Sequence, residues 1–556
     1  MAQSNSTIET RALGEFLTSR QKFLVMNSLM IAMFISALDQ SIVATATPHI
    51  LADLGGFKLL SWVFTIYLLA STVTVPLVGK LSDMFGRKPF LLAGITVFVA
   101  GSAACGAATS MPFLIFARGF QGIGGGILFG CVFATLGDLF TPLERAKYMG
   151  YFIGSFTLAS LIGPTVGGFL TDGPGWRWCF YINLPVGAIA SAFIWVNLPY
   201  TRKGGRLSEV DFIGAACLSV ATICILLGLV WAQNRFGWVS AETLGLFAAG
   251  AAFTLAFVFQ ESRHPQAIFP LHIFKNRTFV QANALVVLQG GGMFGAITYL
   301  PTFIQISLGQ SATASGLVST PQSIGLLASS IVGGQLVSRT GKYKLQVILG
   351  SFMGLAATIL MQTLDVGSPT WHISLFMVIF GLGGGLVGPT ISVIVQSAVP
   401  QSLMGVATSS RQFFMQIGQV MGVAIFGLIF TTTFASSFSS GISAETAATL
   451  SQAGATAQFE DPTLALDARG SKRVSDELSA LPNGPAALAD ASDAQKHAVA
   501  TATERLFLGS TFAGIVVVLI AFLMREVPLR RTFGPPEAEE GERSKGVLEP
   551  EFALVD

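Results

Sequence analysis

Charged residues are scarce in this chain. Only 11% of its 556 residues are Asp, Glu, Lys or Arg, while 52% are hydrophobic; a soluble globular protein carries about 25% charged residues. The formal net charge is +2, so the balance lacks the basic excess typical of nucleic-acid-binding proteins, and we expect no nucleic-acid partner. The composition instead indicates a membrane protein that is surrounded by lipid.

Cysteine and histidine are also few. The five cysteines have no CxxC spacing, and all but Cys179 lie inside apolar runs. Neither a disulfide framework nor a zinc site is therefore predicted, and we expect the cysteines to be small residues that pack between helices. The five histidines are scattered and form no cluster with acids or cysteines at one membrane face, which disfavours an enzyme: His49, His264, His272, His372 and His497.

Nucleotide-binding motifs are missing as well. No GxxxxGK[ST] sequence occurs, so the chain carries no P-loop and ATP-driven transport would need a separate subunit. A GxGxxG spacing occurs at 383–388, but it lies within an apolar run with no preceding strand, so we interpret it as a false positive. We expect no metal and no cofactor.

What the chain does contain is a series of long apolar runs. A helix needs about 20 mostly apolar residues to cross a bilayer. Fourteen such runs are present, at 23–47, 61–79, 89–108, 112–138, 147–171, 178–198, 211–231, 241–260, 279–306, 314–337, 345–364, 372–397, 404–433 and 506–525. They predict an all-α integral membrane protein, in which the first run is an uncleaved helix because it is long enough to span.

The distribution of cations predicts the orientation of these spans. If the N-terminus is cytoplasmic, Lys and Arg gather on the inner side, and the short outer loops hold only Lys58, Arg177 and Arg235. Six of the seven tryptophans then fall at outer helix ends, where amphipathic rings prefer to lie: Trp62, Trp176, Trp178, Trp231, Trp238 and Trp371. We predict that both termini are cytoplasmic, and the character of the motifs favours a bacterial cytoplasmic membrane.

An internal repeat divides the chain into two halves. GKLSDMFGRK at 79–88 reappears as GQLVSRTGKY at 334–343, and GIGGGI at 122–127 reappears as GLGGGL at 381–386, at offsets of 255 and 259. A simple duplication of six helices would give an offset of about 180 residues, and the excess of about 70 fits two inserted helices. Parallel repeats of this kind form transporters whose substrate site lies between the halves.

The repeat also sets the expected domains. These are a cytoplasmic N-terminus at 1–22, a six-helix bundle at 23–200, a linker with two inserted helices at 201–276, a second six-helix bundle at 277–526 that includes a long extracytoplasmic loop at 434–504, and a cytoplasmic tail at 527–556.

Five sequence motifs carry a family resemblance. They are LDQSIVATATP at 38–48, GKLSDMFGRK at 79–88, RGFQGIGGG at 118–126, GSFTLASLIGPTVGG at 154–168 and WRWCFYINLPVG at 176–187. With this set the chain resembles the major facilitator superfamily, specifically its fourteen-helix drug:proton antiporter family, from about residue 25 to 430 and again at the last helix.

The resemblance implies a function as well as a fold. It implies two six-helix bundles that alternate access to a central site, and proton-coupled export of small lipophilic or amphiphilic compounds, the multidrug efflux that confers antibiotic resistance. The proton is then the coupling ion. A dedicated exporter of one endogenous metabolite or lipid is an alternative, and a non-transporting membrane sensor is a further one.

The turn at 79–88 is a candidate conformational latch, comprising Gly79, Asp83, Gly86, Arg87, Lys88 and Asp138. The resemblance implies that Asp83 caps the N-terminus of a neighbouring helix and that Arg87 pairs with Asp138. Alternatively, the cations of this turn only determine topology. In the second repeat Ser338 stands in place of Asp83, so we expect the latch to be one-sided.

The fifth span carries a second candidate motif, comprising Gly154, Gly163, Pro164, Gly167 and Gly168. Gly163 and Gly167 form a GxxxG face that lets another helix approach closely. The resemblance implies that this face packs against the eleventh of the twelve helices shared by the halves, at 404–433, and marks an antiporter. Ordinary tight packing is the alternative.

Asp39 is the main chemical signal, because a carboxylate at the centre of a spanning helix costs about 2.5–3.5 kcal/mol and usually marks function. Arg118 is its natural partner, since the two lie about 15 and about 9 Å below the outer surface. We therefore expect them to face each other in the outer half of the cavity and to couple transport to protons. A permanently ionised pair that only fixes helix packing is the alternative.

The substrate cavity is expected among polar and aromatic residues of the spans: Trp62, Tyr67, Gln121, Gln289, Tyr299, Gln305, Arg411 and Gln416. Arg411 is expected nearer the cytoplasm. Because few charges besides Asp39 are buried, we expect neutral or cationic lipophilic cargo. The loop at 434–504 is interpreted either as a gate or contact for an accessory partner, or as a poorly ordered linker, and the protein is expected to be a monomer.

Overall fold

The computed structural model describes residues 17–55, 59–200, 206–234, 236–460, 468–479, 481, 483–526 and 529. Within these ranges the chain forms helices and connecting loops and no strand. The predicted N-terminal segment 1–22 lies mostly, and the predicted tail 527–556 almost wholly, outside the described residues.

The first half of the chain forms a helical bundle, and several of its helices begin at residues that favour a helix start. Its helices are α2 (Ser19–Leu54), α3 (Leu60–Phe85), α4 (Arg87–Gly106), α5 (Met111–Leu139), α6 (Pro142–Asp172), the short α7 (Trp178–Tyr181) and α8 (Asn183–Asn197). Thr18 and Thr141 begin α2 and α6 with complete capping boxes. Gly86, at φ 95°, both ends α3 and begins α4, a conformation that favours glycine.

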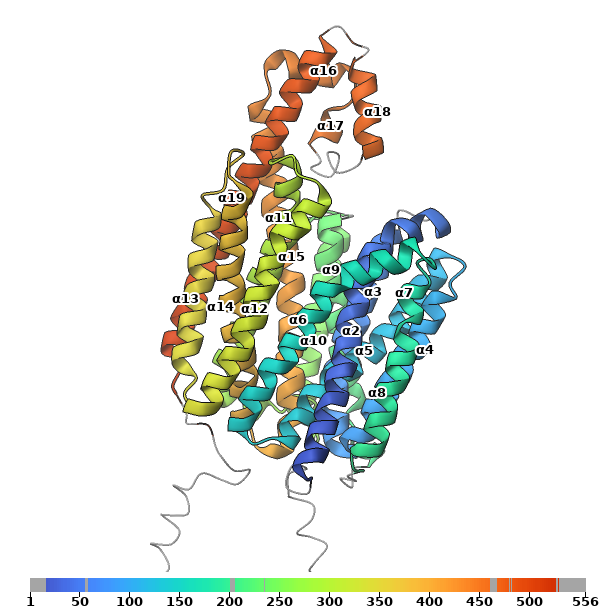
Figure 1. The fold of residues 1–556 in the computed structure, drawn as a ribbon, viewed down its shortest axis with the longest axis vertical. Coiled ribbons are helices and arrows are strands. Elements are labelled where there is room, and N and C mark those ends of the chain that lie inside the picture. The colour runs from blue at the N-terminus through green and yellow to red at the C-terminus, as the bar shows by residue number, and fades with distance from the viewer. Residues whose placement is uncertain are drawn as a thin grey trace, which may run out of the picture.

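The second half repeats this arrangement. Its helices are α11 (Arg277–Ile306), α12 (Ala312–Thr340), α13 (Lys344–Met361), α14 (Thr370–Ser397), α15 (Met404–Gly441) and α19 (Gly484–Leu523). Between the halves run α9 (Phe212–Asn234) and α10 (Ala241–Glu261), which pack on each other, and a loop that contains the short helix η3 (Leu271–Lys275). Figure 1 shows the two bundles side by side, the first in blue to cyan and the second in yellow to red.

Twelve helical segments in the described part of the chain are long and apolar enough to cross a membrane. The all-α membrane fold is therefore confirmed, but the count of fourteen spans is not. The two predicted spans outside the twelve, 279–306 and 314–337, fall on α11 and α12. These helices have 30 and 29 residues.

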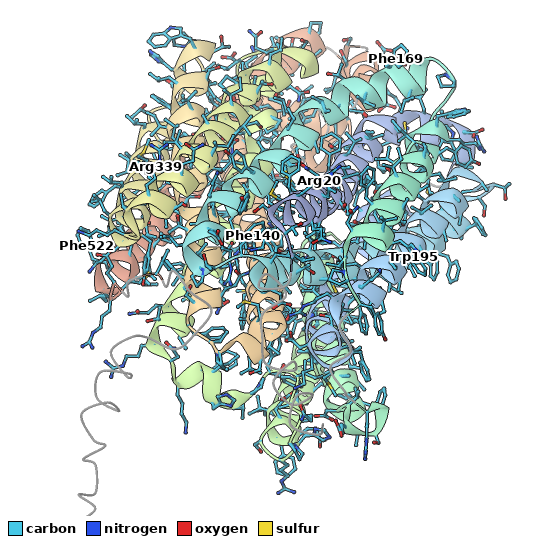
Figure 2. The ribbon with its side chains drawn as sticks, turned by 60° about the horizontal axis from the view of Figure 1, so that its bottom comes forward. Arg20, Phe140, Phe169, Trp195, Arg339 and Phe522 are labelled. Carbon is cyan, nitrogen blue, oxygen red and sulfur yellow. The ribbon has the colours of Figure 1, made fainter. Side chains whose placement is uncertain are left out.

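Large apolar side chains cover the outside of the bundle. Phe169, Trp195 and Phe522 project away from their helices (Figure 2) and are 76%, 68% and 50% exposed. Aromatic side chains exposed over so much of a surface would aggregate in water. In a membrane protein, these exposed aromatic side chains contact the lipid that surrounds the bundle.

Two helices extend beyond the bundle. α15 and α19 have 38 and 40 residues, and their far ends pack with α16 (Ala444–Gln452), α17 (Thr456–Phe459) and α18 (Ala468–Ser479) into a small helical region at one end of the molecule (Figure 1), which we call the cap. Its core includes a stack of Phe434, Phe438 and Phe459. The interpretation of 434–504 as a poorly ordered linker is therefore wrong for the described residues, because apolar side chains pack its helices together.

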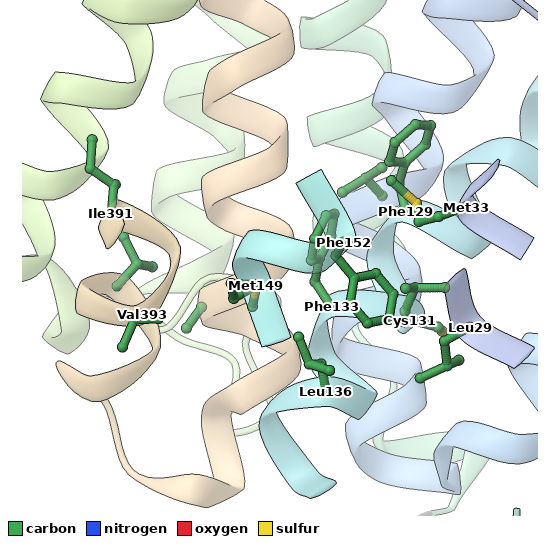
Figure 3. Packing of buried hydrophobic residues seen from close by; sticks show 14 of the residues in the cluster. Leu29, Met33, Phe129, Cys131, Phe133, Leu136, Met149, Phe152, Ile391 and Val393 are labelled. Atoms are coloured by element: carbon green, nitrogen blue, oxygen red, sulfur yellow. The ribbon is translucent and has the colours of Figure 1, made fainter. Parts of the chain in front are cut away.

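The two bundles share a core at the end opposite the cap, which we call the Arg87 end. Three helices are buried without interruption there, over residues 124–139 of α5, 389–396 of α14 and 404–413 of α15. Figure 3 shows labelled members of this core from both halves, among them Phe133 and Phe152 from the first and Ile391 from the second. The halves are therefore closed against each other at the Arg87 end.

Candidate functional site

A cavity of about 930 Å³ lies between the halves. Its wall is built by α2, α3, α5 and α6 from one half and by α11, α12, α14 and α15 from the other, and α9 contributes Leu229 and Val230. Most of the wall is apolar, and glutamine side chains supply much of its polar surface. A space of this size accommodates a small organic molecule.

Four of the residues predicted for the cavity line it: Tyr67, Gln289, Arg411 and Gln416. Trp62, Gln121, Tyr299 and Gln305 do not line it. Trp62 packs edge-on against Trp231 with ring centroids 6.0 Å apart, and Tyr299 stacks on Phe430 at 4.9 Å. Trp62 and Tyr299 had been expected to contact a ligand, but their rings pack against aromatic rings of other helices.

Asp39 and Arg118 form an ion pair inside the first half. Oδ2 of Asp39 lies 2.6 Å from Nη1 of Arg118, and the two residues are 0% and 1% exposed. The sequence correctly predicted that they face each other. It placed them in the cavity, however, and neither residue lines it.

Neutral side chains complete the environment of Asp39. Its Oδ1 accepts hydrogen bonds from the amide groups of Gln121 and Asn183, both at 2.8 Å. Asn183 also donates to Oγ of Ser102 at 2.9 Å. Sequence reasoning missed Asn183, although it belongs to the motif at 176–187. The available signal was an amide side chain within a predicted span.

Tyr67 connects this network to the cavity. Its ring lies 4.4 Å from the guanidinium carbon of Arg118, in cation–π geometry, and the same residue lines the cavity. The ring of Tyr67 thus lies between the ion pair and the cavity.

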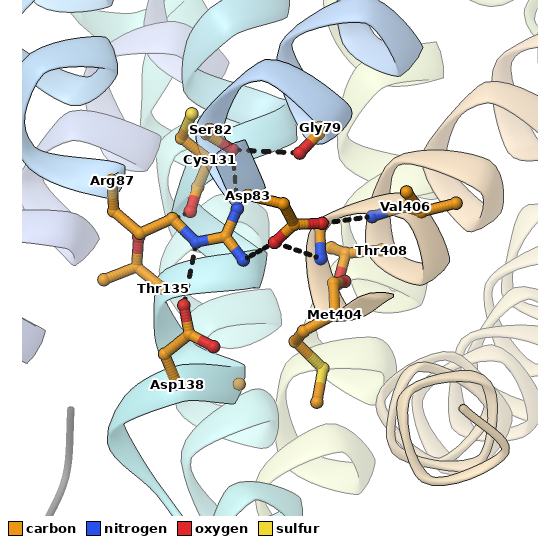
Figure 4. Close-up of polar contacts among 12 residues, drawn as sticks. Gly79, Ser82, Asp83, Arg87, Cys131, Thr135, Asp138, Met404, Val406 and Thr408 are labelled. Atoms are coloured by element: carbon orange, nitrogen blue, oxygen red, sulfur yellow. Dashed lines mark hydrogen bonds and ion pairs between the residues drawn. The ribbon is translucent and has the colours of Figure 1, made fainter. Parts of the chain in front are cut away.

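The predicted latch lies at the Arg87 end (Figure 4). Arg87 donates through Nε to Oδ2 of Asp138 at 2.8 Å and also pairs with Asp83. The two carboxylate oxygens of Asp83 accept the backbone N–H groups of Gly405 and Val406, both at 3.1 Å. These amides belong to the first turn of α15, where orphan donors and the helix dipole favour an anion.

Two glycines allow α3 and α15 to meet at this latch. A Cβ on Gly79 would lie 2.8 Å from the carbonyl oxygen of Gly405, and one on Gly405 would lie 2.4 Å from that of Gly79. The backbones are therefore in direct contact. Gly79 was predicted from its motif. Gly405 was missed, because a single glycine at the start of a long span carries little signal.

Lys88 does not take part in the latch. Its Nζ donates to the carbonyl oxygen of Trp195 at 2.6 Å and lies over the ring of that residue. It therefore ties α4 to the end of α8. A further buried cation, Arg145, donates to the carbonyl oxygens of Gly137 and Phe140, which sequence reasoning did not foresee.

The second repeat keeps the close approach but not the charges. A Cβ on Gly334 would lie 2.5 Å from the carbonyl oxygen of Ala146, so α12 and α6 meet as α3 and α15 do. Within 334–343, all of which the structure describes, no residue forms an ion pair. The charged contacts are therefore present on one side, at α3 and α15.

The GxxxG face of the fifth span packs differently from the prediction. A Cβ on Gly163 would lie 2.1 Å from Oγ of Ser41, and one on Gly167 would lie 2.1 Å from Oγ1 of Thr45. Both partners belong to α2, so the expected packing against 404–433 is wrong.

The neighbours of α6 and α15 explain this correction. α6 lies between α2 and α12, whereas α15 packs on α11, α19 and α3. In the rest of the motif, Gly154 faces Leu327 of α12, a Cβ on Gly168 would meet nothing within 4 Å, and Pro164 lies within a continuous helix.

Hydrogen bonds join the halves at and near the Arg87 end. The amide of Gln396 donates to the carbonyl oxygen of Phe133 at 3.2 Å, and the amide of Gln416 donates to Oγ of Ser71 at 3.1 Å. Together with the latch and the shared core, these contacts close that end. The cavity lies beyond them, on the side of the cap.

Two helical bundles around a shared cavity, in a chain with many membrane spans, define a membrane transporter. The chain belongs to the Major Facilitator Superfamily, whose family model matches residues 29–423. This family consists of transporters rather than enzymes, and the protein is accordingly a multi-pass membrane transporter.

Several relatives carry transporter names. The chain is 42% identical to the multidrug transporter protein MdtP of Bacillus subtilis, over 74% of this chain and 75% of that protein. It is 36% identical to multidrug resistance protein 3 of the same species, over 74% and 80%. It is 33% identical to the acurin A biosynthesis cluster MFS-type transporter of Aspergillus aculeatus, over 74% and 75%. The resemblance stated from the motifs is thus confirmed.

Solved structures of more distant proteins share the fold. The human organic anion transporter MFSD10 aligns with a TM-score of 0.57 at 15% identity, over 89% of this chain and 99% of that one. The proton:xylose symporter XylE aligns with a TM-score of 0.58 at 13% identity, over 92% and 97%. At such identities the likeness concerns the fold alone.

Proposed function

We propose that this protein exports small lipophilic or amphiphilic compounds by alternating access, driven by protons that Asp39 carries. The observation that supports this most directly is a buried carboxylate paired with Arg118 and separated from a large, mostly apolar cavity by the ring of Tyr67. The names of the bacterial relatives support multidrug efflux as the physiological role.

The charge pattern supports an orientation with the Arg87 end in the cytoplasm. The cavity would then face outward in this conformation, since the Arg87 end is closed. Opening that end requires breaking the contacts of Asp83 with the first turn of α15. The latch would thus set the populations of the two conformations.

The two oxygens of Asp39 accept three hydrogen bonds in the closed network. A proton would load when the halves move and the network opens. An inward proton crossing 100 mV supplies about 2.3 kcal/mol, which supports a roughly fiftyfold substrate gradient. One titrating carboxylate is therefore sufficient for useful export.

The test is uphill transport in proteoliposomes. Accumulation of N-phenyl-1-naphthylamine, a neutral lipophilic fluorescent compound, driven by an imposed pH gradient would be compared between the wild type and Asp39→Asn. We expect the variant to bind this compound and to exchange it downhill, but not to accumulate it. Asp53→Asn is the matched control, because Asp53 is also on α2 and also pairs with an arginine, Arg177, but lies exposed. Unchanged uphill transport by Asp39→Asn would contradict the coupling role.

A dedicated exporter of one metabolite is the second candidate. It is favoured by the relative named for a biosynthesis cluster. Competition with N-phenyl-1-naphthylamine by chemically unrelated lipophilic compounds supports the multidrug role, while transport of a single compound class supports the dedicated one.

A further inference from the structure

Arg411 places a cation in the cavity wall. It lies on α15 about two turns from its start, its side chain lines the cavity, and the residue is 8% exposed. Its nearest polar contact is the sulfur of Met415, 3.9 Å from Nη2, and its Nε has no hydrogen-bond partner. Within the part of the chain that the structure describes, no oxygen atom accepts a hydrogen bond from this guanidinium.

The other deeply buried arginines of the described chain each donate to oxygen atoms, although Nε of Arg145 has no hydrogen-bond partner. Arg87 pairs with Asp83 and Asp138, Arg118 pairs with Asp39, and Arg145 donates to two carbonyl oxygens. Burying a cation without an anion is costly, and such groups in membrane spans usually face a cavity and a functional partner. Among these four arginines of the described chain, Arg411 is thus the one that donates to no oxygen, and it lines the cavity.

The surroundings of Arg411 fit an amphiphile with an acidic group. The described cavity wall contains this arginine and no Asp or Glu. Gln412 and Gln419 add amide donors nearby on α15. On the part of the wall that the first half contributes, an aromatic surface for the apolar part of such a ligand is provided by Phe129, Phe133 and Phe156.

We propose that the cavity binds organic anions, with a carboxylate or sulfonate on Arg411 and the apolar body against the aromatic wall. This inference rests on the proposed export function and specifies its substrate class. It replaces the sequence-based expectation of neutral or cationic cargo. That expectation assumed that Asp39 could interact with cargo, but Asp39 is paired with Arg118 and does not line the cavity.

The test uses two fluorescent probes that share one skeleton. 1-Anilinonaphthalene-8-sulfonate carries a permanent anion, and N-phenyl-1-naphthylamine lacks it. Both would be titrated against the full-length protein in phosphatidylcholine nanodiscs, with empty nanodiscs as the baseline. Because hydrogen bonds to charged groups are among the stronger ones, Arg411→Gln should raise the Kd of the sulfonate about tenfold or more. The Kd of the neutral probe should change less than about twofold.

Arg411→Lys separates charge from packing. It should keep the affinity for the sulfonate within about threefold of the wild type, since it preserves the cation. Unchanged sulfonate affinity in Arg411→Gln would overturn the proposal. So would an equal loss for both probes, which would show that Arg411 only maintains the shape of the cavity.

A measurement on the wild type covers the case in which Arg411→Gln does not fold. Naphthalene-1-sulfonate should displace the bound anilinonaphthalene sulfonate more strongly than 1-naphthylmethanol does, and equal displacement would overturn the proposal. Intact binding of the neutral probe without an anion preference would refute this inference and leave export standing. Loss of pH-driven accumulation with an intact anion preference would count against proton coupling instead.

Discussion

Asn183 donates a 2.8 Å hydrogen bond to Asp39, on the same oxygen that Gln121 binds. Asn183 is the first residue of α8, and Gln121 lies on α5. Side chains of two other helices therefore bind the carboxylate of α2. Both oxygens of the carboxylate are therefore hydrogen-bonded in this conformation. Asp39 can serve as a proton carrier only if these helices separate during the cycle.

Asn183→Ala should destabilise this conformation. It removes one donor from a buried carboxylate and leaves Ser102 without its amide partner, at a cost of about 1–3 kcal/mol. The thermal unfolding midpoint in detergent should fall. Asn197→Ala is the control, because Asn197 is on the same helix but is exposed and donates to the carbonyl oxygen of Phe193. Equal midpoints for the two variants would show that the bond to Asp39 is dispensable.

Asp83→Asn should loosen the first turn of α15. Asparagine loses the charge that pairs with Arg87, and its amide can accept fewer hydrogen bonds from Gly405 and Val406. Losing a charged cap costs about 1–2 kcal/mol, so amide exchange in a peptide covering 404–408 should speed up about tenfold. Ser338→Ala, at the matching position of the second repeat, should leave this exchange unchanged. Equal exchange in Asp83→Asn and wild type would argue against a latch.

Gly163→Ala should disturb the packing of α6 on α2. The new methyl group would collide with Ser41, and overpacking costs about 1–3 kcal/mol. Gly168→Ala makes the same change where a Cβ meets nothing within 4 Å, and it should be neutral or slightly stabilising because alanine favours helix. The comparison is read from the two unfolding midpoints. A decrease for Gly168→Ala as large as for Gly163→Ala would refute the packing explanation.

The exposed pair at the cap side predicts a pH dependence. Hydrogen bonds from Arg177 and then Trp176 lower the pKa of Asp53 below its ordinary value of 3.8. A depressed folded-state pKa stabilises the protein above the ordinary value, and this contribution is lost as the pH falls through the folded-state pKa. Asp53→Asn should therefore unfold at a lower temperature than wild type at pH 7. The difference should disappear as the pH falls below 3.8 and through the lowered pKa of Asp53, and a constant difference would contradict this assignment.

The sequence predicted the charged contacts well because buried charges have few acceptable partners. The pair of Asp39 with Arg118 follows from depth and from the rarity of such residues in spans, while the pair of Arg87 with Asp138 was implied by the family resemblance. Choices among neutral residues were less predictable. A GxxxG pattern shows that a helix comes close but does not say which one, so Gly163 was assigned to the wrong neighbour.

Polar residues in spans were equally ambiguous. Tyr299 and Gln416 look alike as cavity candidates, yet only the latter lines the cavity, because helix rotation decides which face a side chain occupies. The absence of a partner for Arg411 could not be read from the sequence either, since it depends on where every nearby acid and carbonyl lies.

The inserted helix α9 has a consequence for the membrane around the transporter. It packs against both α3 and α15 through apolar residues, with Leu226 and Leu229 beside Val420 and Ala424, and so covers the seam between the halves on that side. Leu229 and Val230 of the same helix also line the cavity. On that side α9 therefore lies between the acyl chains and the cavity, so a compound dissolved in the lipid there meets an apolar helix rather than an opening.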